Sequence, residues 1–355
     1  MKRDDSGDPD PARGTARGGR APTLRDAGEF GLIALVGRKY GGNPTRGEIP
    51  IGDDAAVLRV PGGRAVLSTD LLIEEVHFSL RYFRPEEVGW KALSANLSDL
   101  AAMGARPLGY LVAFASPART PVSSIDAMFR GMARAAAPSG MRLLGGDTCR
   151  GERLTLSLTV VGCVERGRPV LRVGARPGDL LYVTGEPGWS GLGFRLLRGG
   201  RPAAPRGWKR RAMRAHLAPE ARWREGLIAG ASGAAASMID VSDGVLPDLS
   251  HLLERDGLGA ELTEATFPVS ASYRKASSAL GVDPLAAFLC GGEDYELLMA
   301  VRPSRRGIFL RAVRAFPAGA TPIGSVTRRP GIRIRRTDGS TVEGAGLPSG
   351  FAHFP

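Results

Sequence analysis

The stretch PEEVGWKALSANLSDLAAMG, residues 85–104, predicts a long helix around which the rest of the fold can be placed. Pro85 suits a first helical turn, and the acidic pair that follows it complements the helix dipole. Three leucines share one face of the helix: Leu93, Leu97 and Leu100. Asp99 lies on the flank of that face, beside Asn96. We therefore predict a helix from Pro85 to Met103 that carries polar residues beside its apolar stripe.

Short β-rich runs flank this helix on both sides. Before it, residues 55–60 and 64–68 have the composition of strands. After it, residues 108–114 and 154–161 do so too, with a second helix expected over 124–137. Strands and helices are mixed without a strict βαβ rhythm, so the pattern favours an α+β class over a doubly wound sheet.

The second half of the chain repeats this mixture after a turn at 176–179. Further strands are expected over 180–184 and near Ile239, Leu297 and Ile323, and helices near Leu192, Ala221 and Leu246. At 355 residues the chain exceeds the usual size of one core, so two domains are expected. We place the boundary near Val173, between an N-terminal domain over 28–172 and a C-terminal α+β domain over 173–355.

Residues 1–27 are rich in Gly, Pro, Arg and Asp and nearly devoid of large apolar side chains, so we expect a disordered tail. Order is expected to begin at residue 28, with a short amphipathic helix over 30–37. The chain contains no apolar stretch long enough to span a bilayer and no signal-peptide pattern. We expect a cytoplasmic protein that does not contact a membrane.

The net charge of +12 raises the question of nucleic-acid binding. One dense basic run lies between Arg195 and Arg224. Because no groove-reading motif or interleaved aromatic residues accompany it, a solvated loop and helix face is the favoured interpretation, and nucleic-acid binding is not expected. The cysteines, Cys149, Cys163 and Cys290, show neither metal-ligand nor disulfide spacing.

Acidic residues recur after apolar runs or in Gly-containing turns. The set comprises Asp53, Asp54, Asp70, Asp147, Asp240, Asp243, Glu293 and Asp294. Asp70, for example, is expected to close the strand that begins before Ala65, whereas Asp99 lies within the long helix. If these carboxylates meet in one cleft, their repulsion requires cations. Oxygen ligands without His or Cys favour a hard cation such as Mg²⁺ bound together with substrate phosphates, which indicates phosphoryl transfer.

Each acidic residue taken alone also has a purely structural interpretation. An Asp in a Gly turn often bonds only its own backbone, and Asp243 could cap a helix begun near Pro247. The chain has no G-x-x-x-x-G-K-[ST] loop, no protein-kinase signature set and no G-x-S-x-G elbow. Two Gly pairs could let backbone amides approach phosphate, and Arg172 could contact it, although a tight turn and a surface arginine are the plain alternatives.

Seven motifs occur in order along the chain. They are GEF at 28–30, IGDDA at 51–55, STD at 68–70, KAL with NLSDLAAMG within 91–104, GGDT at 145–148, DVSDG at 240–244 and GGEDYEL at 291–297. Together they resemble the thiamine-monophosphate kinase family, of the superfamily that includes aminoimidazole ribonucleotide synthetase. The resemblance extends from about residue 28 to the C-terminus.

The resemblance implies a two-domain α+β subunit whose N-terminal mixed sheets pair across a homodimer into a β-barrel, with ATP in a cleft. It implies transfer of the γ-phosphoryl group of ATP to thiamine monophosphate, giving thiamine diphosphate. Several Mg²⁺ ions would be bound by Asp53, Ser68, Thr69, Asp70, Asp99, Asp147, Asp240 and Asp243. ATP would contact Gly146, Asp147, Arg172 and Ser242, and the thiamine substrate His77, Glu293 and Phe351. No covalent or general-base residue is implied.

The sequence also departs from the family pattern. Trp189 stands where a small or acidic residue is expected, and Phe351 where Trp or Tyr is more frequent. The nearest alternatives are other ATP-dependent members of the superfamily and a non-catalytic polyanion-binding protein. A selenophosphate synthetase would carry a reactive residue near its N-terminus and a hydrogenase-maturation protein a C-terminal Cys, yet the first cysteine is Cys149 and the chain ends in FAHFP.

Overall fold

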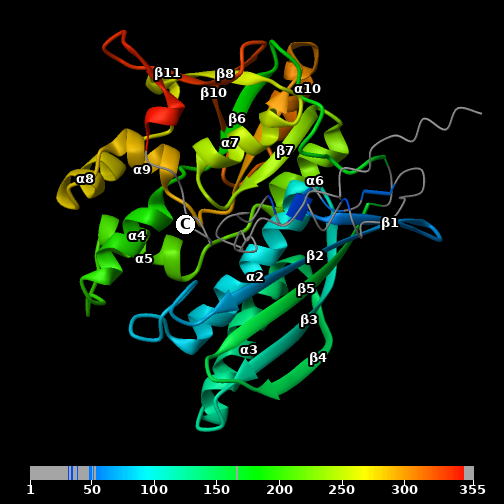
Figure 1. The fold of residues 1–355 in the computed structure, drawn as a ribbon, viewed down its shortest axis with the longest axis vertical. Helices are drawn as coiled ribbons and strands as arrows, with labels where there is room; N and C mark the ends of the chain where they lie inside the picture. The colour runs from blue at the N-terminus through cyan, green and yellow to red at the C-terminus, as the bar shows by residue number, and fades with distance from the viewer. Residues whose placement is uncertain are drawn as a thin grey trace, which may run out of the picture.

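The computed structural model describes residues 53–164 and 167–347, together with Gly31, Ile33, Ala34, Arg38, Glu48, Ile49 and Ile51. Two sheet-containing units follow one another along the chain and pack together, the first in the lower half of Figure 1 and the second in the upper half. The predicted α+β class is confirmed at this level. The expected tail over 1–27 lies outside the described residues, as does most of the helix expected over 30–37.

The first unit contains a five-stranded mixed sheet with the order β1-β2-β5-β3-β4. Its strands are β1 (Ala56–Val60), β2 (Gly63–Ile73), β3 (Arg106–Ser116), β4 (Arg142–Arg150) and β5 (Thr155–Val164). Neighbours are antiparallel except β3 and β4, which are parallel and connected through helix α3 (Val122–Ala136) and the short 3-10 helix η1 (Ala137–Ser139). Within the described residues the sheet is open, so the expected barrel is not formed by one chain.

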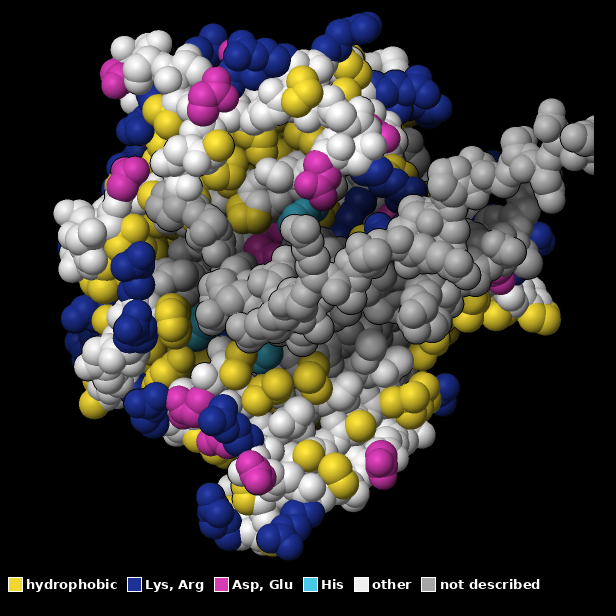
Figure 2. All heavy atoms as spheres, in the orientation of Figure 1, with side chains coloured by type: hydrophobic (Ala, Val, Ile, Leu, Met, Phe, Trp, Pro, Cys, Tyr) yellow, Lys and Arg dark blue, Asp and Glu magenta, His cyan; other side chains and the backbone are white. Residues whose placement is uncertain are grey.

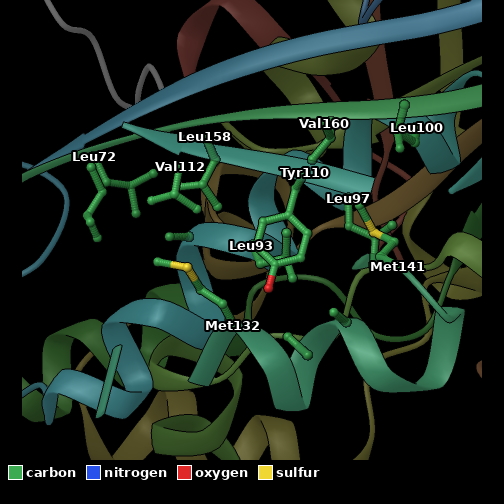
Figure 3. Close-up of a cluster of buried hydrophobic side chains, with 14 of the residues drawn as sticks. Leu72, Leu93, Leu97, Leu100, Tyr110, Val112, Met132, Met141, Leu158 and Val160 are labelled. Carbon is green, nitrogen blue, oxygen red and sulfur yellow. The ribbon is translucent and has the colours of Figure 1, made fainter. Parts of the chain in front are cut away.

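Helices α2 (Pro85–Ala102) and α3 cover one face of this sheet. Alternate residues of β5 point toward the helices, so Leu156, Leu158 and Val160 are buried. Figure 3 shows how Leu93 and Leu97 of α2 pack with side chains from the strands. The opposite face leaves large apolar side chains exposed, among them Leu58, Val60, Leu71 and Leu111.

The second unit contains a seven-stranded sheet with the order β12-β11-β8-β10-β6-β9-β7. Its strands are β6 (Leu180–Thr184), β7 (Ala235–Val241), β8 (Gly259–Thr263), β9 (Glu296–Val301), β10 (Ala320–Thr327), β11 (Gly331–Arg335) and β12 (Thr341–Glu343). Its helices are α4 (Trp189–Arg198), α5 (Trp208–Leu217), α6 (Trp223–Ser232), α7 (Val245–Glu254), α8 (Ala271–Ala279), α9 (Pro284–Cys290) and α10 (Arg306–Val313), with 3-10 turns at 264–266, 303–305 and 344–346.

Helix α2 touches both units, and this contact positions the site. Its C-terminal residues Ala101 and Ala102 are buried among side chains of the second unit. A Cβ atom added at Gly226 of α6 would lie 2.1 Å from the carbonyl oxygen of Ala101, so α2 and α6 approach each other closely because position 226 has no side chain. The polar residues of α2 are therefore held at the junction of the two units.

Two strand predictions need correction. β2 continues to Ile73, so Ser68, Thr69 and Asp70 lie inside a strand instead of closing one. The apolar residues that follow Asp70 extend the pattern, and the antiparallel pairing with β5 runs without a break from Arg64 to Ile73. Asp147, expected just after the run Leu143–Gly146, likewise lies within a strand, the edge strand β4.

Several arginines of the basic segment are paired with acidic side chains. Arg201 bonds Glu87, Arg211 lies 2.7 Å from Glu186, and Arg214 contacts Glu220. On the face drawn in Figure 2, Lys and Arg side chains are spread around the periphery among Asp and Glu. Among the residues that the structure places, no helix is both long and apolar enough to cross a membrane.

We expect Gly131→Ala to destabilise the fold, although Ala favours an isolated helix over Gly by about 1 kcal/mol. A Cβ atom at position 131 of α3 would lie 1.9 Å from the carbonyl oxygen of Glu86 in α2. The two helices would have to separate, at a cost of about 2 kcal/mol in the free energy of unfolding. Urea denaturation measures this loss. Ala133→Ser, at an exposed position of the same helix, is the control, and an unchanged or raised stability for Gly131→Ala would contradict the expected close contact.

Candidate active site

Acidic side chains from three separate parts of the chain meet between the two units. Asp54 precedes β1, Asp99 lies on α2, and Asp240 is near the end of β7. One carboxylate oxygen of each lies within 4.8 Å of the others. Asp54 and Asp240 are buried, and Asp99 is partly accessible. Residues that are far apart in the sequence thus form one carboxylate cluster, here called the Asp54–Asp99–Asp240 cluster.

Arg172 places a positive charge against this cluster. Its guanidinium Nη2 lies 2.5 Å from Asp54 Oδ1. Its backbone N–H faces both carboxylate oxygens of Asp53, at 3.2 and 3.3 Å. The other oxygen of Asp54 is buried and has no hydrogen-bond partner among the described residues. An orphaned buried carboxylate oxygen is unfavourable unless something else binds it.

Strand β2 and helix α2 add oxygen atoms beside the cluster. Ser68 and Asp70 share the face of β2 that looks toward α2, because side chains alternate along a strand. The hydroxyl of Ser68 donates a hydrogen bond to the Asp99 carboxylate. The backbone N–H of Asp70 donates to Asn96 Oδ1 at 3.2 Å, which ties the middle of β2 to α2. The predicted proximity of this part of β2 to Asp99 is therefore present in the fold.

The acidic side chains perturb one another's protonation. Burial, followed by the neighbouring charge of Asp54, raises the pKa of Asp53 to about 6 and that of Asp240 to about 7. Burial raises the pKa of Asp70 to about 6. The pKa of Asp99 is raised by burial and by the charges of Asp70 and Asp240. Arg172 opposes the shifts of Asp53 and Asp240 but does not offset them, so without a cation these carboxylates retain protons at a higher pH than exposed carboxylates do.

The loop after β7 is held in place by an acidic residue that the sequence did not single out. Oδ2 of Asp248, on α7, accepts hydrogen bonds from the backbone N–H groups of Ser242, Asp243 and Gly244, at 3.0, 3.1 and 3.1 Å. The loop that carries Ser242 is therefore fixed beside the cluster. The N-cap residue of α7 is Gly244 and no side chain caps the helix, so the capping role considered for Asp243 is not present.

Other predicted site residues lie elsewhere on the first sheet. Thr69 faces away from α2, where its hydroxyl bonds the carbonyl oxygen of Leu158 at 2.9 Å. Asp147 pairs with Ala113 on the same outward face, in the exposed strand β4. Gly146 lies so close to β3 that a Cβ atom would be 1.8 Å from the carbonyl oxygen of Val112. The described chain by itself does not bring Thr69 and Asp147 to the cluster, and their role as ligands stays a prediction.

The two described residues expected at the substrate, His77 and Glu293, are joined by a buried lysine. Nζ of Lys91 lies 2.6 Å from Glu293 Oε1 and donates to the carbonyl oxygen of His77 at 3.2 Å. Nδ1 of His77 accepts the N–H of Ile73, so a neutral His77 carries its proton on Nε2. Phe351 lies outside the described residues.

Besides Asp248, sequence reasoning missed three residues of this region. Asp54 was noted beside Asp53 but was not assigned to the metal, although it is the one that joins the cluster. Lys91 belongs to the KAL motif, but a lysine in a helix is expected to be exposed to solvent, and its burial is known only from the structure. His216 lies in the basic segment, and no motif in the sequence indicated a role for it.

Trp189, which departs from the family pattern, is a core residue. Its Nε1 donates a hydrogen bond to Glu186, and its ring contacts that of Tyr273.

Models of the AIR synthase related protein family match this chain twice. The N-terminal domain model matches residues 52–164 and the C-terminal domain model residues 176–336. A thiamine-monophosphate kinase from Mycobacterium tuberculosis is 37% identical over 313 residues, covering 87% of this chain and 88% of that protein. The thiamine-monophosphate kinase of Bacillus subtilis is 34% identical over 83% of this chain and 90% of its own length. This chain belongs to the thiamine-monophosphate kinase family.

A solved structure of the family has the same fold. AaThiL complexed with AMPPCP and TMP superposes with a TM-score of 0.81 at 32% identity, covering 94% of this chain and 99% of that chain. In this member of the family, the Asp54–Asp99–Asp240 cluster suits a hard divalent cation. Its donors are all oxygen atoms, they converge within 4.8 Å, and one buried oxygen of Asp54 lacks a partner within the described part of the chain.

We expect Mg²⁺ to stabilise the protein more near pH 8 than near pH 5. The raised pKa values of Asp70 and Asp240, about 6 and about 7, mean that the folded state keeps protons that the unfolded chain releases. Without a cation, this contribution to stability is full below the ordinary Asp pKa, near 4, and is lost as the pH rises through about 7. A cation that binds the ionised carboxylates reverses this loss.

Thermal unfolding with Mg²⁺ or with EDTA at the two pH values measures the effect. Asp240→Asn is expected to reduce the Mg²⁺-dependent rise in Tm. Asp126→Asn, which changes an exposed carboxylate of α3, is the control. An equal rise in Tm at both pH values would argue against binding at these carboxylates.

Proposed function

We propose that this protein phosphorylates thiamine monophosphate with ATP, giving thiamine diphosphate and ADP. The single observation that carries the proposal is the Asp54–Asp99–Asp240 cluster with Arg172 beside it, in a chain that belongs to this family. Relatives named thiamine-monophosphate kinase match most of the chain, and the AaThiL structure holds AMPPCP and TMP. The protein is accordingly a phosphotransferase with a phosphate group as acceptor.

The reaction requires little help from a general base. An oxygen of the acceptor phosphate forms a bond to the γ-phosphorus of ATP, and the bond from that phosphorus to the oxygen bridging to the β-phosphate breaks. ADP leaves with the bond's electron pair. Because the acceptor phosphate is already ionised, no proton has to be removed from it, and positioning with electrostatic stabilisation supplies the catalysis.

The carboxylates around the cluster would hold Mg²⁺, the cofactor that we assign to this enzyme. Asp54, Asp99 and Asp240 offer converging oxygens, with Ser68 and Asp70 beside them. When bound, Mg²⁺ would screen the repulsion between two anionic substrates and stabilise charge on the transferred group. We assign further ligand roles to Asp53, Thr69, Asp147 and Asp243, and contacts with ATP to Gly146, Asp147, Arg172 and Ser242. The guanidinium of Arg172 lies at the cluster, where it can pair with phosphate oxygens.

The thiamine end of the acceptor would lie near His77 and Glu293. The thiazolium ring is a cation, and Glu293 places a carboxylate whose side chain is 34% exposed at the junction of the two units. Phe351 is assigned to the same subsite, where an aromatic ring would suit a cationic ring. Lys91 links the backbone of His77 to the carboxylate of Glu293, which supports a common subsite for these two residues.

We also propose that the protein forms homodimers, in which the first sheets of the two subunits pair into a β-barrel. The support is the outward face of that sheet, on which Leu71 is 49% exposed and Leu111 is 40% exposed. Both leucines lie on central strands of the sheet, β2 and β3. A neighbouring subunit would cover these apolar side chains and would bring a second outward face, with its own Thr69 and Asp147, to the same place.

A non-catalytic polyanion-binding protein is the alternative from another class. The ion pairs that the basic segment forms, such as Arg201 with Glu87 and Arg211 with Glu186, leave less of its charge for a polyanion. Retention of buried acidic residues that repel one another also favours a cation-binding enzyme. Other ATP-dependent reactions of the superfamily are distinguished by the acceptor substrate in the assay below.

We expect Asp70→Asn to lower kcat by about a hundredfold or more, as expected when one electrostatic group of a phosphoryl-transfer site is lost. The change removes a carboxylate charge but keeps the volume of the side chain and its place in β2. A coupled assay for ADP, with thiamine monophosphate, ATP and Mg²⁺ each omitted in turn, measures the rate. Asp126→Asn serves as the control for an exposed Asp. Well-folded wild-type protein without turnover would refute the proposed function.

We expect Leu111→Glu to convert dimers to monomers, because it would place a charge within the apolar sheet face that the second subunit covers. Light scattering after size-exclusion chromatography measures the mass. Leu310→Glu, at a position of α10 that is 41% exposed and lies in the second unit, is the control. A wild-type monomer, or a Leu111→Glu protein that remains dimeric, would contradict the assembly.

A further inference from the structure

Lys91 is almost completely removed from solvent. It lies on α2, one helical turn before Ala95, and its side chain is 1% exposed. Moving an ammonium group out of water is costly unless it is paired and hydrogen-bonded. A buried lysine at this position therefore needs partners, and its partners indicate what it does.

The partners of Lys91 come from two parts of the proposed thiamine subsite. Nζ lies 2.6 Å from Oε1 of Glu293, which follows helix α9 in the second unit. It also donates to the carbonyl oxygen of His77, in the loop after β2, at 3.2 Å. The ring of Phe83 lies below the ammonium, with its centroid 5.3 Å away. One buried cation thus holds together two loops that are far apart in the sequence.

Glu293 is held in a backbone conformation that it would rarely adopt alone. Its φ angle is +62°, in the left-handed region that disfavours residues with a side chain. Its backbone N–H donates to the carbonyl oxygen of Ser242 at 2.6 Å, so the backbone is fixed beside the loop assigned to ATP. The ion pair with Lys91 fixes the other end of the residue. A strained residue anchored at both ends is set in one position before any ligand arrives.

The second oxygen of Glu293 faces the buried His216. Oε2 lies 3.4 Å from Nδ1 of His216, which is also 3.1 Å from the hydroxyl of Ser190. Burial and the charge of Lys91 lower the pKa of His216 to about 3, so the imidazole is neutral. Burial alone would raise the pKa of Glu293, but the charge and hydrogen bond of Lys91 more than offset this effect, so the pKa is lowered and Glu293 is ionised. Lys91 is therefore the cation that keeps this carboxylate charged and oriented.

We propose that Lys91 is a positioning residue for the substrate, which holds the Glu293 carboxylate and the His77 loop in the arrangement that receives the cationic ring of thiamine monophosphate. The inference rests on the proposed function and deepens it, because it concerns the affinity for one substrate. Lys91 touches neither the carboxylate cluster nor Arg172 in any contact described above. Its loss should therefore affect the thiamine subsite and leave phosphoryl transfer from bound substrates largely unchanged.

The test is steady-state kinetics of Lys91→Met, which keeps the unbranched stem and removes the charge. We expect the KM for thiamine monophosphate to rise about tenfold or more, with kcat and the KM for ATP changed by less than about threefold. Glu293→Gln should raise the same KM. Because the two residues act as a unit, their effects should not multiply. The KM of the double variant for thiamine monophosphate should lie within about twofold of that of the more impaired single variant.

The matched control is Arg201→Met, which removes another ion pair between α2 and the second unit without touching Glu293. It should leave the KM for thiamine monophosphate within about twofold of the wild-type value, because its effects are structural. Lys91→Gln, which keeps a hydrogen-bond donor, replaces Lys91→Met if the latter does not fold.

Three outcomes would overturn the inference. The first is a Lys91 variant whose KM for thiamine monophosphate is unchanged, and the second is one in which both KM values and kcat change together, as for a general structural defect. The third is a double variant whose effect is the product of the two single effects. Wild-type protein that neither turns over nor binds thiamine monophosphate in calorimetry would instead refute the proposed function, and this inference with it.

Discussion

The burial of α2 between the two units is the constraint on which the rest of the structure depends. A helix covered by a sheet on one side and by α6, β7 and β9 on another cannot leave polar groups unpaired at low cost. Yet it carries Lys91, Asn96 and Asp99 into the interior. Lys91 forms an ion pair with Glu293 of the second unit, whereas Asn96 and Asp99 form hydrogen bonds with β2 of the first sheet. The packing of the helix therefore assembles the site.

This arrangement separates two electrostatic environments along one helix. At Asp99 burial and the charges of the neighbouring carboxylates raise the pKa, so full ionisation of this site requires a cation. At Lys91 the ammonium and the Glu293 carboxylate balance each other within the protein. The two positions lie about two helical turns apart, roughly 12 Å along the axis. We assign the phosphate chemistry to the first and recognition of the thiamine ring to the second, so a single rigid element sets the spacing between them.

The sequence predicted well what depends on local pattern. The bounds of α2 and α3, the strand at 180–184 and the mixed α+β class follow from apolar spacing, caps and turns, and the structure agrees with them. It predicted less well what depends on tertiary contact. The carboxylate of Asp54, and not that of Asp53, joins the cluster, and adjacent residues cannot be told apart by spacing. The role of Lys91 could not be predicted because its burial and its partners depend on the fold. That of His216 could not be predicted because no motif contains this residue.

The shared core at the end of α2 bears on how such a chain can be divided. Ala101 and Ala102, encoded with the first sheet, pack against Met299 and Phe309, encoded with the second. A gene fragment that stops between the two sheets would leave this helical surface uncovered, and the complementary fragment would lack part of its own interior. The two units are therefore expected to be inherited, recombined and expressed as a pair, even though each has a sheet of its own.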